Sequence, residues 1–87
     1  MKDNKKYLDK VVEFLVRGTK IDYDKDEIQY PFYPSPLSPI LTTHTFFFPY
    51  PTFSKYCIDV YGLTDQEIGY VWVMYKSIIK DKIENGR

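Results

Sequence analysis

Apolar residues recur at three- and four-residue spacing over residues 65–84, which predicts a long C-terminal helix with one broad apolar face. The residues on this face are Ile68, Val71, Trp72, Tyr75, Ile78, Ile79 and Ile83. Thr64 and Glu67 have the spacing of a capping box, in which each side chain accepts a hydrogen bond from the backbone N–H of the other residue. The helix is therefore expected to begin after Thr64, and Gly86 is expected to end it.

The first half of this helix also carries apolar residues away from the main face, namely Tyr70, Val73 and Met74. A helical turn that is apolar on all sides must be covered by something. Either another part of the chain or another molecule is therefore expected to cover these three residues.

A second amphipathic pattern predicts an N-terminal helix over residues 4–17. Its apolar stripe consists of Leu8, Val11, Val12 and Leu15, flanked by Tyr7 and Phe14, and charged residues fill the opposite face. Asp3 or Asn4 can cap the start of this helix, and Gly18 follows its end.

Over residues 19–32 apolar and polar positions alternate, which predicts a short β-hairpin around a polar turn. Three acidic residues in this stretch have the spacing that opens a calcium loop: Asp22, Asp24 and Asp26. The glycine and glutamate that such a loop requires at its sixth and twelfth positions are replaced by Glu27 and Tyr33, so no calcium site is expected.

Residues 33–51 contain five prolines, which exclude a helix over most of the segment and predict extended backbone. The apolar run ILTTHTFFF at residues 40–48 is typical of a strand. We expect this segment to pack over the second face of the long helix, or else to be an apolar arm that needs a partner. The expected contact surface consists of Leu37, Ile40, Phe46, Phe47, Phe48, Tyr70, Val73 and Met74.

A short helix is predicted over residues 53–61, with Thr52 as its N-cap and Gly62 as the residue after its end. Its apolar face would consist of Phe53, Tyr56, Cys57 and Val60. No basic residues surround Cys57 in a pattern that would lower the pKa of its thiol, so a buried structural role is expected.

The composition fits one small, mainly α-helical domain of 87 residues. The net charge is zero, which argues against strong electrostatic attraction to nucleic acid or to an anionic membrane. One cysteine, no membrane-spanning run and no signal peptide predict a soluble intracellular protein. Nine Tyr, six Phe and one Trp fit either a core built from large rings or an aromatic contact surface.

No pattern in the sequence marks a catalytic, cofactor or metal site. The single histidine, His44, lies in the apolar run and has no cysteine or histidine cluster near it in sequence. The four glycines form no phosphate-binding loop. We therefore expect a protein that is not an enzyme, holds no cofactor or metal, and has no small-molecule substrate.

Two stretches, YLDKVVEFLVRGTKIDYDKDEI at residues 7–28 and YCIDVYGLTDQEIGYVW at residues 56–72, resemble short proteins encoded by marine bacteriophages. The resemblance covers both ends of the chain but not the proline-rich middle. It implies a phage-encoded accessory or virion protein, located in the host cytoplasm or in the virion, and it assigns no site residues.

The stretch at residues 56–72 also resembles a helix-turn-helix, which implies DNA binding as an alternative function. A recognition helix presents its first residues to base edges among phosphates, and here those positions carry the acidic Asp65 and Glu67. We therefore expect binding to another protein, or self-association, ahead of a small DNA-binding regulator.

Overall fold

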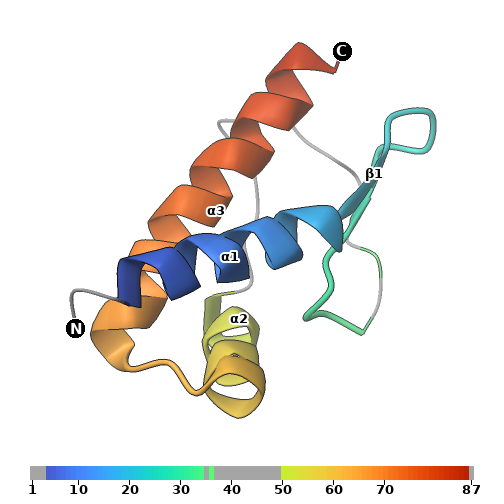
Figure 1. Cartoon of the computed structure of the whole chain (residues 1–87). Helices are drawn as coiled ribbons and strands as arrows, with labels where there is room; N and C mark the ends of the chain where they lie inside the picture. Colours follow the sequence, from blue (N-terminus) through green and yellow to red (C-terminus); the bar gives the residue numbers. More distant parts are fainter. Residues whose placement is uncertain (1–3, 35, 37–49, 87) are drawn as a thin grey trace.

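The computed structural model describes residues 4–34, 36 and 50–86, and it shows a mainly helical protein with one short hairpin (Figure 1). Its elements are α1 (Asn4–Arg17), β1 (Lys20–Asp22), β2 (Glu27–Gln29), α2 (Tyr50–Tyr56), the π-helix η1 (Cys57–Tyr61) and α3 (Asp65–Asn85). The predicted strand at residues 40–48, which contains His44, lies outside the described residues, and so do five residues of the expected contact surface: Leu37, Ile40, Phe46, Phe47 and Phe48.

Helices α1 and α3 cross obliquely, and their facing apolar stripes form most of the core (Figure 1). From α1 the buried residues are Leu8, Val11, Val12 and Leu15; from α3 they are Ile68, Val71, Tyr75, Ile79 and Ile83. This confirms both predicted apolar stripes. Trp72 and Ile78 are only partly buried, at the two edges of the α3 stripe. No helix in the described ranges is both long and apolar enough to cross a lipid bilayer.

A cluster of aromatic rings fills the core between the hairpin, α2 and α3. Phe32 lies 5.0 Å from Tyr30, 5.2 Å from Phe53 and 5.9 Å from Tyr75 between ring centroids. Phe53 and Tyr75 stack nearly parallel at 5.9 Å. Offset and edge-on ring pairs of this kind are favourable beyond the area they bury. Large rings therefore supply much of the interior of this small domain.

The predicted hairpin is present, although its strands are shorter than the alternating pattern. Strands β1 and β2 pair antiparallel, with Ile21 opposite Ile28. The Asp22 carboxylate accepts the backbone N–H groups of Asp24 at 3.1 Å and Lys25 at 3.2 Å. Asp26 adopts a left-handed conformation with φ of 55°. This turn has no Asn-Gly or Asp-Gly pair of the kind found in tighter hairpins, and the Asp22 side chain stabilises it by accepting hydrogen bonds from its backbone N–H groups.

The short helix begins earlier than the sequence predicts, and its second half differs in type. Helix α2 starts at Tyr50, so Thr52 lies inside it and is not its N-cap. Pro51 is compatible with this start because the first turn of a helix needs no N–H from proline. At Cys57 the helix widens into η1, and this ends at Gly62, which has φ of 65° as predicted for a left-handed terminal residue. The wider turn leaves Val60 54% exposed instead of on the predicted buried face.

The end of α3 meets the hairpin turn. The Tyr23 hydroxyl donates a hydrogen bond to the carbonyl oxygen of Lys82 at 2.7 Å. Gly86 caps the helix, as expected, with a right-handed φ of −85°. A Cβ atom at this position would collide with the Tyr23 hydroxyl. A larger residue here would have to displace the Tyr23 ring from its hydrogen bond to Lys82.

Candidate functional site

Three residues of the expected contact surface are described, and all three belong to α3. Tyr70 and Met74 lie on the side next to α1, whereas Val73 lies on another side of the helix with Trp72 and Lys76. Val73 is 56% exposed and Met74 is 39% exposed. Tyr70 is partly buried, and its hydroxyl donates a hydrogen bond to the Asp9 carboxylate on α1 at 2.9 Å. The three predicted contact residues therefore differ in environment. Tyr70 links α3 to α1 by a hydrogen bond, whereas the apolar side chains of Val73 and Met74 are exposed to solvent.

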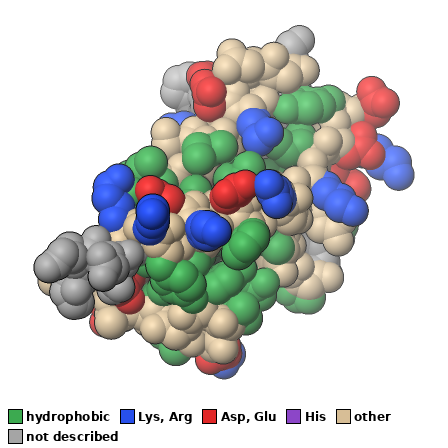
Figure 2. Space-filling view, in the orientation of Figure 1, with side chains coloured by type: hydrophobic (Ala, Val, Ile, Leu, Met, Phe, Trp, Pro, Cys, Tyr) green, Lys and Arg blue, Asp and Glu red, His purple; other side chains and the backbone are tan. Residues whose placement is uncertain are grey.

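An open groove with a volume of about 450 Å³ runs between α1 and α3 next to these residues. Its apolar lining consists of Val12 and Val16 from α1 and Tyr70, Met74 and Ile78 from α3. In Figure 2, hydrophobic side chains gather at the surface on both sides of the row of charged residues on α1. The groove is thus a shallow apolar strip bounded by a charged rim.

The charges on the α1 rim of the groove neutralise one another. Lys5 lies 3.7 Å from Asp9, and Arg17 lies 2.7 Å from Glu13, measured between nitrogen and oxygen atoms. Such exposed pairs at i,i+4 spacing stabilise a helix by only a few tenths of a kcal/mol, about 0.3–0.5. Their larger effect here is to leave the groove without a net charge, so an apolar partner surface suits it best.

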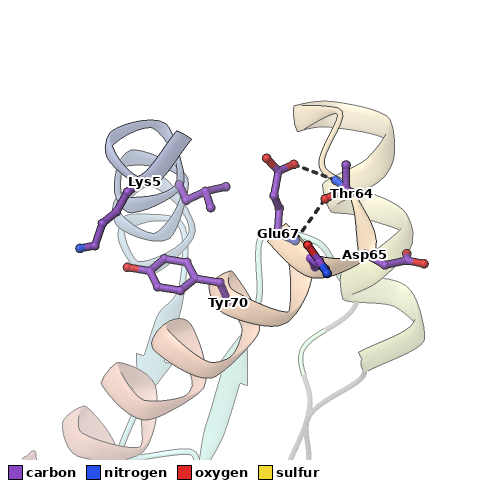
Figure 3. A pocket seen from close by; sticks show the side chains of 7 residues that line it. Lys5, Thr64, Asp65, Glu67 and Tyr70 are labelled. Carbon is purple, nitrogen blue, oxygen red and sulfur yellow. Dashed lines mark hydrogen bonds between the residues drawn. The ribbon is translucent and has the colours of Figure 1, made fainter. Parts of the chain in front are cut away.

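A second open pocket, of about 680 Å³, lies at the start of α3 (Figure 3). The Glu67 carboxylate accepts the Thr64 N–H at 2.9 Å, and the Thr64 hydroxyl accepts the Glu67 N–H at 3.3 Å. These are the two dashed bonds in Figure 3, and they confirm the predicted capping box. Because both N–H groups are already bonded and Asp65 and Glu67 are acidic, this helix start does not favour an anion.

The thiol of Cys57 is enclosed by the core. Its side chain is fully buried, and this burial raises the pKa of Cys57 to about 11. A thiol with a raised pKa is a poor nucleophile at neutral pH. The structural role expected for Cys57 agrees with this environment. Among the residues that the structure describes, no group of His, Cys, Asp and Glu side chains is arranged to hold a metal ion.

The segment that resembles a helix-turn-helix consists of η1, the Gly62 turn and the first turns of α3. Asp65 is exposed at the start of α3, and Glu67 closes the capping box beside it. The first basic residue of α3 is Lys76, and its ammonium lies 4.6 Å from the centre of the Trp72 ring. The leading end of this helix is therefore acidic, and its first lysine lies over an aromatic ring.

Sequence reasoning missed two parts of the surface. It assigned Val16 and Ile78 no role in contacts, although they line the groove. It placed Tyr7 and Phe14 at the flanks of the apolar stripe of α1, which agrees with their exposure of 46% and 51%, but it gave them no role in contacts. Their outward position follows from their angle on the helix, which lies at the edge of the stripe. A helical-wheel plot could have shown this.

No family model, curated protein or solved structure matches this chain. Its function is therefore inferred from its own residues and their geometry.

Proposed function

We propose that this chain acts by binding another protein, without catalysis, and that its binding surface is the α1–α3 groove together with Val73 and Met74. The observation that supports this proposal is the exposure of Met74 (39%) in the lining of an apolar groove, with the more exposed Val73 (56%) next to it in the sequence of α3. Single exposed apolar residues are common on proteins. An exposed apolar side chain that lines a groove, with a second one near it, is instead a feature of contact sites.

The chemistry of this surface suits an apolar segment of a partner protein. Methionine is flexible and polarisable, so Met74 can adapt to the shape of an incoming side chain. The hydrogen bond from Tyr70 to Asp9 holds the two walls of the groove together before any partner arrives. A preformed site of this kind loses less conformational entropy on binding.

The setting of this interaction is part of the same proposal. The resemblance of residues 7–28 and 56–72 to short marine phage proteins suggests a phage-encoded accessory or virion protein. Its partner would then be another virion component or a protein of the host.

Quantitative affinity purification from the native cell tests this function. The tagged wild type is compared with Val73→Ser/Met74→Ser, in which both exposed apolar side chains become polar. Because the two residues already lie in contact with solvent, thermal melts should show little change in stability. We expect the amount of the specific partner recovered to fall at least about tenfold, as the loss of about 1.4 kcal/mol of binding free energy would produce.

The matched control is Ile58→Ser/Val60→Ser, which removes two similarly exposed apolar side chains from η1. This control should retain the partner. Equal recovery by wild type and by the Val73/Met74 variant, or equal loss in both variants, would show that the groove is not the binding surface.

A further inference from the structure

The other flank of α1 carries a second surface, which we call the outer face of α1: Lys6, Tyr7, Lys10 and Phe14. The Tyr7 side chain is 46% exposed and that of Phe14 is 51% exposed, and both lysines are exposed. Residues three, four and seven apart lie on one side of a helix. The two rings therefore stand two turns apart, with Lys10 between them.

Basic side chains outnumber acidic ones on α1. Its two acidic residues near the middle, Asp9 and Glu13, line the groove side, where they pair with Lys5 and Arg17. Neither Lys6 nor Lys10 forms an ion pair with any carboxylate in the described part of the chain. The outer face of α1 is therefore both aromatic and positively charged, in a protein whose net charge is zero.

One of the two rings is held in place by the neighbouring element. The Tyr7 hydroxyl donates a hydrogen bond to the carbonyl oxygen of Tyr61 at 3.0 Å. Tyr61 is itself packed against the core, with its ring 6.0 Å from that of Tyr56. A fixed aromatic ring offers contact area with little further loss of rotamer freedom, as aromatic anchors at interfaces do.

We infer that the outer face of α1 docks an acidic amphipathic helix of a partner protein. Tyr7 and Phe14 lie about 10 Å apart along the helix axis at 1.5 Å per residue, which matches apolar residues two turns apart on a partner helix. Lys6 and Lys10 lie one turn apart, and carboxylates at i,i+4 spacing on that helix would meet them. This surface lies away from the groove, so the inference does not depend on the function proposed for the groove.

A protein partner fits this face better than single-stranded nucleic acid. Aromatic rings beside lysines can stack bases and contact phosphates. However, a phosphate backbone carries a continuous run of negative charge, and binding it takes a correspondingly long run of cations. Here the face offers two lysines that form no ion pair with a described carboxylate, and the acidic Asp9 and Glu13 lie on the same helix. Short, local charge complementarity is what an acidic helix requires.

The test measures the anisotropy of fluorescein-labelled peptides of about four helical turns. The probe has leucines along one face and glutamates on both sides of that face. One comparison peptide replaces the glutamates by lysines, and the other replaces the leucines by serines. A labelled oligothymidylate of similar length tests whether the protein binds single-stranded nucleic acid instead. We expect the acidic leucine peptide to bind at least about tenfold more tightly than either comparison peptide and more tightly than the oligonucleotide.

Charge-swapped variants identify the surface. Lys6→Glu/Lys10→Glu should weaken binding of the acidic peptide at least about fivefold and strengthen binding of the lysine peptide, because opposite charges then face each other. Phe14→Ser should weaken binding of the acidic peptide as well. Val73→Ser/Met74→Ser should leave it unchanged, and circular dichroism melts check that every variant is folded.

Three results would overturn the inference. The first is no binding of the acidic peptide up to about 1 mM, the range of very weak complexes. The second is the same affinity in the charge-swapped protein, which would place the binding elsewhere. The third is tighter binding of the oligonucleotide than of the peptide, which would make the outer face of α1 a nucleic-acid surface.

Discussion

The Tyr75 side chain of α3 is fully buried, and its hydroxyl forms a hydrogen bond with the hydroxyl of Thr19, just after the end of α1. The Thr19 hydroxyl also donates its only proton to the carbonyl oxygen of Leu15 at 2.8 Å. Tyr75 is therefore the donor in the bond between the two hydroxyls. This arrangement joins the end of α1 to the middle of α3 inside the core, where a buried hydroxyl without a partner would cost about 1–3 kcal/mol.

Burial of ionisable groups in this core makes the fold sensitive to alkaline pH. Burial raises the pKa of Cys57 from about 9 to about 11, and it raises the pKa of Tyr75 and of Tyr30 above the ordinary tyrosine value. A group whose pKa is higher in the folded state binds its proton more tightly there. The stability it contributes is complete below the unfolded-state pKa and is lost as pH rises toward the folded-state pKa.

We therefore expect the free energy of unfolding to fall as pH rises above about 9. Deprotonation of Cys57 accounts for the first part of this fall, and deprotonation of Tyr75 and Tyr30 accounts for the later part. Each such group contributes a slope of about 1.4 kcal/mol per pH unit within its own window. Urea melts at intervals from neutral pH to pH 11 measure this slope. Cys57→Ala should flatten the part between pH 9 and 10, whatever its effect on stability at pH 7. An unchanged slope in this variant would show that Cys57 does not titrate in that window.

At the scale of elements, the start of α3 follows directly from local sequence. Its side chains at Thr64 and Glu67 bond to each other's backbone N–H groups, and this needs no contact from the rest of the chain. The start of α2 could not be assigned in the same way. The sequence places two prolines around Tyr50, and a proline in the first turn of a helix is indistinguishable by pattern from one in an extended segment.

The remaining differences have tertiary causes. The Tyr23 hydroxyl, more than sixty residues earlier in the chain, occupies the space beside Gly86 at the end of α3. The π-helical turn at Cys57–Tyr61 changes which residues face the core, and periodicity calculated for an α-helix misplaces Val60. Sequence patterns thus predicted the elements and the two apolar stripes, but not contacts between distant residues.

Thr64→Ala should lower the free energy of unfolding by about 1 kcal/mol, because the Glu67 N–H loses its side-chain acceptor. Urea denaturation of purified protein measures this change. Gln66→Ala is the matched control, since Gln66 is exposed in the same first turn and takes no part in the capping box. The control should stay within about 0.5 kcal/mol of wild type. Equal effects of the two changes would mean that the capping box contributes nothing specific.

On the scale of the whole molecule, the same helix presents two different surfaces. On one flank α1 forms a neutral, apolar groove with α3. On the other flank it presents aromatic rings and lysines that form no ion pair with a described carboxylate. Sequence reasoning named Tyr70, Val73 and Met74 as contact residues; Tyr70 and Met74 line the groove, and Val73 lies outside its lining. It could not assign the groove itself, because this forms only when α1 crosses α3.

The central claim is that the groove and its neighbours Val73 and Met74 bind another protein. Site-specific photocrosslinking tests it most directly. A benzophenone amino acid is placed at position 73, or at the similarly exposed position 58 on η1, and the cells that naturally make the protein are irradiated. Crosslinked products are then identified by mass spectrometry. This reports which molecule lies within reach of each side chain in the cell.

We expect a defined crosslinked protein from position 73 and none above background from position 58. Met74→Ser in the same chain should reduce the yield of the product from position 73. The same products in equal yield from both positions, or no product from position 73, would contradict the account, and Val73 and Met74 would then be ordinary exposed side chains.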